Sequence, residues 1–337
     1  MRFGRYVGKR LGLMVITLFG VLVITFTLSH VIPADPIAAI TGGQAPPEVI
    51  ERIRERMGYN DPLHIQFFRY IRRIFDGDLG RSIATRHLVT QDLKDKFPAT
   101  IELATTAMLI SICIGIPLGM ISAIKRDKLP DHGARIFSLV GNSMPAFWLG
   151  LILLLIFYYY LDLLPGGSQL DYFMERPPRR TGLMTIDSIL DRNPEAFLNY
   201  LKHLILPAFV LGYLFTAQIA RITRSSMLEV LQQEYIRTAR AKGLREWVVI
   251  YRHALRNALI PTTTIIGLAY GGLLEGSVLT ETIFSWPGLG SYVTGAFLSL
   301  DFPAVMGGTL LIAVIYSLAN LTVDIVYVLI NPRIRYA

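Results

Sequence analysis

The chain has 337 residues, and its composition is too apolar for an ordinary soluble domain. Charged residues make up 17% of it, where soluble domains typically have about 25%, and its mean hydropathy is +0.45. So much apolar surface excludes intrinsic disorder. The single cysteine, Cys113, excludes an internal disulfide and a cysteine-rich zinc site.

Six long apolar runs predict six membrane-spanning helices. A helix needs about 20 residues to cross a hydrocarbon core of about 30 Å, and each run is near or above that length. The runs are 11–32, 99–124, 136–164, 204–222, 259–279 and 305–330. Six such runs with almost no interior charge are not the pattern of buried helices in a soluble core. The predicted fold class is therefore all-α, as a polytopic membrane protein.

Positive charge predicts the orientation of these helices. Lys and Arg greatly outnumber Asp and Glu in four segments: before the first run, between the second and third, between the fourth and fifth, and after the sixth. The positive-inside rule places these segments, and hence both the N and C termini, in the cytoplasm. The net charge of +8 follows from this topology, so no nucleic-acid partner is needed to explain it.

The first outer loop is predicted to contain two short amphipathic helices. Pro47 opens a segment with apolar residues at helical spacing, and Gly58 closes it. Asp61 is predicted to be the N-cap of a second helix, with Pro62 at its first position. Both helices are expected to pack against the outer side of the membrane. No structure is predicted for the second outer loop, 162–203.

The third outer loop, 279–290, carries no basic residue. Pro287 and Gly288 fit the central positions of a type II turn, where glycine accepts a positive φ. Trp286 is expected to anchor this turn at the membrane interface. Two interpretations stay open: a simple return between helices, or an element at the periplasmic mouth of a pore that meets a partner protein. The candidate residues of that mouth are Glu281, Trp286, Pro287 and Gly288.

The large inner loop, 221–257, is the most informative segment of the chain. Small and basic residues over 234–244 predict a short helix with Gly243 as its C-cap. The apolar residues that follow, at 247–251, are more than a solvated loop needs. The spacing fits two hypotheses equally: a helix that docks into the groove of a partner protein, and a basic helix that lies on anionic lipid.

Three carboxylates lie within the apolar runs. Glu102 is near the outer end of its run and is expected to reach water. Glu275 and Asp324 lie deeper, where a charge costs on the order of 2.5–3.5 kcal/mol. They fit a proton relay, although packing groups at a subunit interface are the favoured interpretation. Small and polar residues nearby extend the candidates for a pathway or interface to Tyr270, Gly271, Glu275, Ser277 and Asp324.

No motif in the chain supports chemistry on a substrate. The sequence has no Gly-x4-Gly-Lys-[Ser/Thr] phosphate loop, no His-Glu-x-x-His and no Gly-x-Ser-x-Gly. Its six histidines are scattered and form no pair at metal-ligand spacing. The chain is therefore predicted to be non-catalytic and to bind no metal or cofactor of its own.

Several stretches together resemble the permease subunits of binding-protein-dependent ABC importers, in particular the dipeptide, oligopeptide and nickel group. The resemblance covers essentially the whole chain. Its most specific stretches are Tyr-Ile-Arg-Thr-Ala-Arg-Ala-Lys-Gly-Leu at 235–244, His-Ala-Leu-Arg-Asn-Ala at 253–258 and the segment 280–290.

Permeases of this kind share the cytoplasmic pattern Glu-Ala-Ala-x3-Gly-x9-Ile-x-Leu-Pro. Gly243 matches its glycine, whereas Arg237, Thr238 and Ala239 occupy the Glu-Ala-Ala positions and only Ala239 agrees. Leu255 matches the leucine of the second half. The resemblance implies that this loop couples the chain to a separate ATPase. The implied coupling residues are Arg237, Thr238, Ala239, Arg240, Gly243, His253, Leu255 and Arg256.

The resemblance also implies the architecture and the partners. It implies a type I ABC importer permease in the bacterial inner membrane. Residues 1–97 would hold the first transmembrane helix and a long periplasmic loop, and residues 98–337 a core permease domain of five transmembrane helices. The implied partners are a homologous second permease subunit, two ABC ATPase subunits that bind ATP and Mg²⁺, a periplasmic substrate-binding protein, and membrane lipid.

The expected substrates are dipeptides or short oligopeptides, imported by alternating access. Similar permeases carry nickel chelates, glutathione and dipeptides of D-amino acids, and the sequence does not separate these alternatives. A hypothesis of another class is a secondary transporter or channel that uses Glu275 and Asp324.

Overall fold

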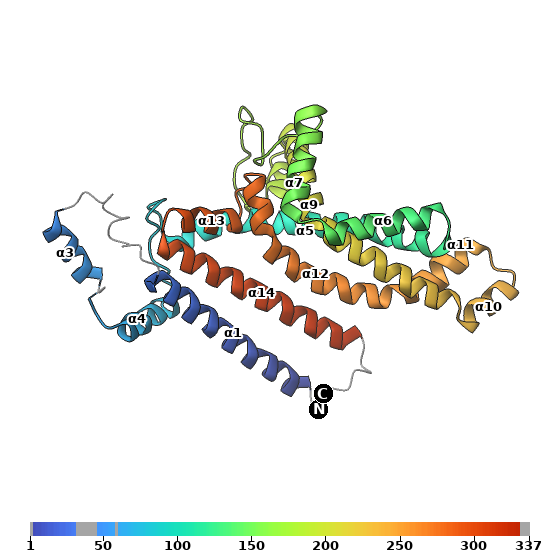
Figure 1. Ribbon diagram of the computed structural model, residues 1–337, viewed down its shortest axis with the longest axis horizontal. Coiled ribbons are helices and arrows are strands. Elements are labelled where there is room, and N and C mark those ends of the chain that lie inside the picture. The colour runs from blue at the N-terminus through green and yellow to red at the C-terminus, as the bar shows by residue number, and fades with distance from the viewer. Residues whose placement is uncertain (1–2, 32–45, 58–59, 331–337) are drawn as a thin grey trace. The chain divides into compact units, whose positions relative to one another are not determined.

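The computed structural model describes residues 3–31, 46–57 and 60–330. Those ranges are built from helices and contain no β-strand, only one isolated antiparallel bridge between Arg81 and Leu88. The chain divides into two compact units (Figure 1). Of the described residues, the first unit holds 3–31, 46–57, 60–98 and 287–321, and the second holds 99–286 and 322–330. The predicted all-α class is confirmed.

Five helices in the described ranges are long and apolar enough to span a membrane, and a bent pair of helices is the candidate for a sixth span. The continuous ones include α1 (Phe3–Val31), α5 (Val89–Ile124), α9 (Pro194–Leu231), the stretch Glu246–Leu274 that leads into α12 (Arg256–Ile283), and α14 (Phe302–Ile330). Each corresponds to one of the predicted apolar runs, because a run long enough for the bilayer is also a run of good helix formers.

The third predicted run is not one continuous helix. It forms α6 (Leu129–Ser143), then α7 (Ala146–Leu153) with a π-helical continuation η1 (Leu154–Tyr160), and the two parts are bent by 112°. The break falls at Met144, which has an extended backbone with φ −87° and ψ 129°. Pro145 follows it, and proline disfavours helical geometry in the residue before it.

Helix α9 is central to the second unit, where it contacts α6, α7, α8 and α12. It also lies very close to α5, because glycines face the crossing. A Cβ atom on Gly119 would lie 2.4 Å from the carbonyl oxygen of Ala220, and one on Gly212 would lie 2.6 Å from that of Ala107. The Ser111 hydroxyl donates to the Gly212 carbonyl at 2.8 Å. Small residues of this kind allow membrane helices to approach closely.

The second outer loop contains a short helix, α8 (Met184–Leu190), for which no structure was predicted. Glu102 holds it in place, because its carboxylate accepts hydrogen bonds from the backbone N–H groups of Met184 and Thr185, each at 2.8 Å. The Tyr200 hydroxyl donates to the same carboxylate at 2.8 Å. Glu102 is therefore buried, and the expectation that it reaches water is wrong.

The first unit confirms the two predicted amphipathic helices, α3 (Pro47–Met57) and α4 (Leu63–Phe75). The predicted cap of α4 is wrong by one residue. Pro62 is the N-cap, and Asp61 instead forms an ion pair with Arg69. Gly58, predicted to close the first of these helices, lies outside the described residues.

Candidate functional site

The inner loop forms a small folded end to the α9–α12 pair (Figure 1). It consists of α10 (Glu234–Ala241), the single turn α11 (Glu246–Val248) and a π-helical segment η2 (Val249–Leu255) that continues into α12. The predicted short helix is confirmed, but its C-cap is Lys242, and Gly243 is the residue directly after the cap. Gly243 has φ +77°, and its N–H donates to the Arg240 carbonyl at 2.9 Å while Leu244 N–H donates to that of Ala239 at 3.4 Å. This pair of bonds is a Schellman motif, which needs a left-handed residue.

One side of α10 is built into the protein. Ile236 and Ala239 are buried in an apolar cluster that joins the ends of α5 and α9 to η2 and the start of α12. Its other members are Met120, Ala123, Met227, Val249, Ile250, Ala254 and Ala258. Burying a side chain such as isoleucine contributes about 1.5–3 kcal/mol. Helix α10 is therefore held firmly on α5, α9 and α12.

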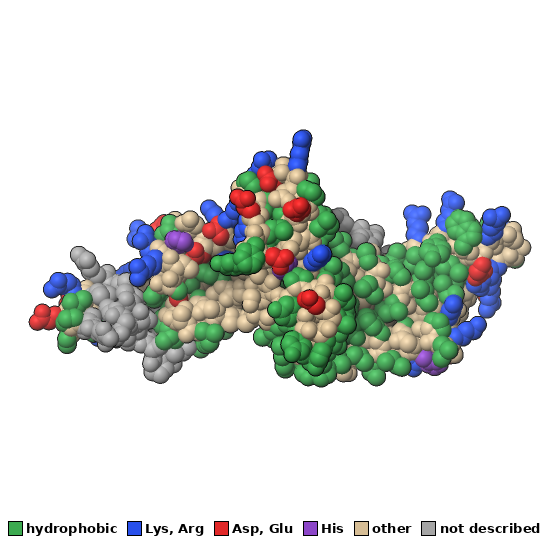
Figure 2. Space-filling view, turned by 90° about the horizontal axis from the view of Figure 1, so that it is seen from above, with side chains coloured by type: hydrophobic (Ala, Val, Ile, Leu, Met, Phe, Trp, Pro, Cys, Tyr) green, Lys and Arg blue, Asp and Glu red, His purple; other side chains and the backbone are tan. Residues whose placement is uncertain are grey.

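The other side of this loop is a mixed aromatic and basic surface. Trp247 is 61% exposed and Tyr251 is 55% exposed, and Tyr235 and Leu244 are also exposed. Figure 2 shows Lys and Arg side chains gathered at this end together with hydrophobic ones. The docking surface is defined by the exposed residues Tyr235, Arg237, Thr238, Lys242, Leu244, Trp247 and Tyr251. Exposed apolar side chains among basic ones fit both hypotheses for this loop, contact with a partner protein and contact with anionic lipid.

The implied coupling residues separate into two groups. Arg237 and Thr238 are on the docking surface, and Gly243 shapes its edge. Ala239 faces the buried cluster instead, and Leu255 packs against that cluster from η2. Ala239 and Leu255 therefore support the fold of this loop and are not part of its exposed surface.

Ion pairs distinguish the two arginines of α10. The Arg240 guanidinium donates to both carboxylate oxygens of Glu246, at 3.2 and 2.7 Å, and so ties α10 to α11. Among the residues that the structure describes, the ion-pair partner of Arg237 is the exposed Glu234 of its own helix, at 2.7 Å. Exposed pairs of this kind contribute little to stability, so Arg237 can exchange its partner at small cost.

The remaining implied coupling residues lie next to the docking surface. His253 is in η2, and Arg256 is exposed at the first position of α12. The Asn257 side chain donates to the His253 carbonyl at 3.0 Å and to the Tyr235 hydroxyl at 2.9 Å. Tyr235, Trp247 and Asn257 were not among the predicted site residues. Tyr235 and Trp247 could have been found from the sequence, because they are aromatic residues within a basic loop.

The pathway candidates on α12 have ordinary packing environments. The Tyr270 hydroxyl is 3.0 Å from the Thr105 hydroxyl, which links α12 to α5. Gly271 is buried, and the buried Ser277 hydroxyl donates to the Leu274 carbonyl of its own helix at 3.1 Å. The side chains of Glu275 and Asp324 lie outside the described residues.

The predicted turn at the outer mouth is wrong. Gly288 has φ −95° and ψ −172° and is the N-cap of a helix that was not predicted, α13 (Leu289–Leu298). The residue with positive φ is Ser285, at 47°. Gly288 therefore does not occupy the left-handed position of a type II turn.

Two of the predicted mouth residues are buried in the second unit. Trp286 is not an interface anchor: its ring lies 5.6 Å from that of Tyr200, and its indole N–H donates to the Ala99 carbonyl at 3.0 Å. Glu281 is also buried and accepts a hydrogen bond from the Thr100 hydroxyl at 2.7 Å. These residues hold the start of the apolar part of α5 against the end of α12. Pro287 and Gly288 belong to the first unit.

A buried ion pair joins α6 to α9, and no sequence signal pointed to it. The Arg224 guanidinium donates to both carboxylate oxygens of Asp131, at 2.7 and 2.8 Å. Asp131 is fully buried and also accepts from the Ser122 hydroxyl at 2.5 Å and from the Asp127 N–H at 3.0 Å. Fork-to-fork pairs of this kind are geometrically specific. Asp131 thus connects three helices of the second unit.

Comparison with protein families gives two matches that together cover most of the chain. The model described as binding-protein-dependent transport system inner membrane component matches residues 115–336. A model for the N-terminal part of membrane components of the same transport systems matches residues 3–104.

Curated relatives match over nearly their full lengths. The chain is 47% identical to the probable D,D-dipeptide transport system permease protein of Escherichia coli strain K12, over 99% of this chain and 98% of the relative. It is 46% identical to the di/tripeptide transport system permease protein of Pseudomonas aeruginosa strain UCBPP-PA14, over 98% of each chain. It is 37% identical to the glutathione transport system permease protein of Salmonella paratyphi A, over 98% of this chain and 99% of the relative.

Proposed function

Since this chain belongs to the family of inner membrane components of binding-protein-dependent transport systems, we propose that it is one permease subunit of an ATP-driven importer of dipeptides or short peptides. The observation that carries the substrate class is 46–47% identity, over almost the whole chain, to two permeases that are named for D,D-dipeptides and for di/tripeptides. Glutathione is the second candidate substrate, on the weaker similarity of 37%.

The docking surface is the part of the chain that would engage a separate ATPase subunit. Its aromatic side chains can fill a groove, and Arg237 and Lys242 can pair with acidic groups at the groove's edge. Aromatic residues and arginine are the residue types that dominate binding energy in protein interfaces. ATP and Mg²⁺ would bind to that partner, and this chain would supply no catalytic group.

The buried side of α10 provides the means of coupling. Ile236 shares one apolar cluster with the ends of α5 and α9 and with the start of α12. A displacement of α10 would therefore be transmitted to α9 and α12 rather than absorbed in a loose loop. α12 carries Tyr270, so the movement reaches a helix with candidate pathway residues. A homologous second permease would supply the other half of the pathway, and a periplasmic binding protein would deliver the substrate.

Under this proposal both termini and α10 would be cytoplasmic. The basic segment between α5 and α6 and the basic segment around α10 lie at the same end of the second unit, because the last turn of α5 packs against α10. Such a concentration of Lys and Arg is the pattern of a cytoplasmic face.

Co-purification tests the docking role. The tagged chain is extracted from membranes with its partner subunits, and the bound ATPase is quantified for Trp247→Ala and for the control Trp148→Ala. Trp148 is an exposed tryptophan on α7, away from α10. Loss of a central aromatic residue typically costs about 2 kcal/mol or more, so recovery of the ATPase should fall by about thirtyfold for Trp247→Ala only. Full recovery with Trp247→Ala, or no ATPase with the unmodified chain, contradicts the proposal.

A further inference from the structure

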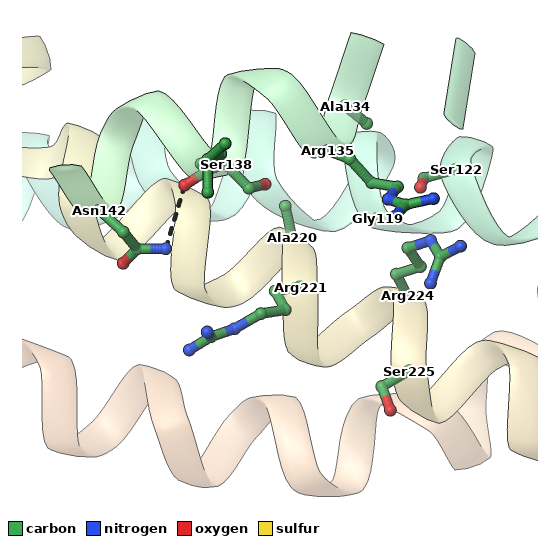
Figure 3. Close-up of a pocket in the computed structure, with 11 residues that line it drawn as sticks. Gly119, Ser122, Ala134, Arg135, Ser138, Asn142, Ala220, Arg221, Arg224 and Ser225 are labelled. Atoms are coloured by element: carbon green, nitrogen blue, oxygen red, sulfur yellow. Dashed lines mark hydrogen bonds between the residues drawn. The ribbon is translucent and has the colours of Figure 1, made fainter. Parts of the chain in front are cut away.

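A polar pocket of about 380 Å³ lies between α5, α6 and α9 in the second unit (Figure 3). It is close to the end that carries α10, because its α5 residues Gly119 and Ser122 neighbour Met120 and Ala123 of the apolar cluster. The polar residues of its wall that matter here are Arg135, Ser138, Asn142, Arg221, Arg224 and Ser225.

The pocket has a surplus of positive charge. Arg224 is neutralised by Asp131, with which it shares two hydrogen bonds. Arg135 and Arg221 have no acidic partner among residues 3–31, 46–57 and 60–330, and both are exposed. Figure 3 shows Arg135 of α6 and Arg224 of α9 extending toward one another. Because Asp131 neutralises Arg224 alone, an oxyanion bound in the pocket would gain charge-assisted hydrogen bonds from Arg135 of α6 and Arg221 of α9, which both line it.

The length of α9 indicates the depth of this pocket in the membrane. Its 38 residues span about 57 Å at 1.5 Å per residue, whereas the hydrocarbon core is about 30 Å thick. A helix centred in the bilayer would extend about 13 Å beyond the core at each end. Arg221 and Arg224 lie about 15 and 10 Å before the end of α9 at Leu231. Arg224 is thus about 3 Å outside the hydrocarbon core and Arg221 about 2 Å inside its edge, so both lie at the boundary with the lipid headgroups, which a long arginine side chain can reach.

The rim of the pocket is apolar and uncovered. Leu139, which lines the pocket, is 68% exposed, and Ile136 one turn before it on α6 is 63% exposed. A free phosphate ion would make no use of this rim, whereas the acyl chains of a lipid would cover it. The same place thus presents basic groups for a headgroup and apolar groups for a tail, which is the chemistry of basic lipid pockets between membrane helices.

We propose that this pocket binds the phosphate group of an anionic phospholipid of the cytoplasmic leaflet. Arg135 and Arg221 pair with the phosphate oxygens, Ser138 and Asn142 offer further polar contacts, and Leu139 lies against an acyl chain. The bound lipid bridges α6 and α9 beside the ion pair of Asp131 with Arg224. The proposal rests on the orientation under which this end of the second unit is cytoplasmic.

Lipid retention by the purified transporter complex tests the proposal. The complex is stripped with detergent and exposed to vesicles of phosphatidylglycerol or of phosphatidylcholine, and the retained lipid is measured by mass spectrometry. The double variant Arg135→Gln/Arg221→Gln should bind phosphatidylglycerol about thirtyfold more weakly, which corresponds to about 2 kcal/mol for two arginines near a headgroup. The control Lys125→Gln/Lys128→Gln removes the same charge from the α5–α6 connection and should leave binding unchanged.

Three results would overturn the lipid site. One is equal retention of the two lipids by the unmodified complex, and another is unchanged retention by the double variant. The third is complete displacement of the lipid by millimolar inorganic phosphate, which would indicate a site for a free anion. ATPase co-purification, measured on the same samples, shows whether the complex is assembled and so separates a failure here from a failure of the proposed function. Arg135→Lys/Arg221→Lys keeps the charge and should retain most of the binding.

Discussion

The Asp131–Arg224 pair makes a sharp test of how the second unit is held together. Asp131→Asn keeps the shape of the side chain but removes the charge that compensates Arg224. The carboxylate is fully buried and accepts four hydrogen bonds, from Arg224 twice, from Ser122 and from the Asp127 N–H. Removing one partner of a buried pair typically costs about 3–5 kcal/mol, because the other charge stays behind without compensation.

The expected cost is smaller here, because the Arg224 side chain is 24% exposed and water can reach part of it. We expect about 2–4 kcal/mol, which lowers the melting temperature of the detergent-purified complex by roughly 3–6 °C for a chain of 337 residues. Tryptophan fluorescence during heating is a suitable assay. The control is Asp127→Asn, four residues away, whose side chain is 70% exposed and pairs with Arg126 at 3.3 Å. An exposed pair contributes about 1 kcal/mol or less, so this change should shift the midpoint by no more than about 1 °C.

A second-site variant separates charge from packing. Arg224→Met combined with Asp131→Asn removes the uncompensated charge as well, so the double variant should be more stable than Asp131→Asn alone. Equal melting temperatures for Asp131→Asn and Asp127→Asn would refute the role of the pair. A double variant as unstable as the sum of the two single changes would show that packing, and not charge, explains the loss.

Two further predictions follow from the helix crossing and from the outer loop. Gly119→Ala should destabilise the complex by about 1–3 kcal/mol, because its Cβ atom would lie 2.4 Å from the Ala220 carbonyl oxygen. Thermal unfolding of the complex measures this effect, and the control is Gly133→Ala, where nothing lies within 4 Å of the new Cβ atom. For Asp187, burial alone would raise the pKa, but hydrogen bonds from the N–H and hydroxyl of Thr181 and from a second backbone N–H outweigh it, so the pKa is lowered. At pH values above its ordinary pKa of 3.8 this carboxylate stabilises α8, and the stabilisation is lost as the pH falls through the lower folded-state pKa. At neutral pH, amide hydrogen exchange of residues 181–190 should therefore be faster in Asp187→Asn than in the unmodified chain, and in acid the two exchange rates should become equal. Exchange rates that still differ in acid would contradict this role of Asp187.

Features that depend on neighbouring residues alone were predictable. The spans follow from the number of apolar residues that a bilayer requires, and α10 ends where Gly243 can take a positive φ. The two helices of the first outer loop follow from Pro47, Pro62 and the spacing of apolar residues. In each case the cause lies within about one helical turn of the effect, so one sequence is enough to see it.

Features that depend on distant partners were not predictable. The sequence predicted that Glu102 reaches water, but α8, which is 82 residues away in the chain, donates hydrogen bonds to its buried carboxylate. It predicted that Trp286 lies at the membrane interface, but Trp286 is buried against Ala99 and Tyr200. The inward position of Ala239 follows only from the helix ends against which α10 packs. Burial and charge compensation are properties of pairs of residues far apart in the chain, and a helical pattern states which residues share a face but not what covers that face.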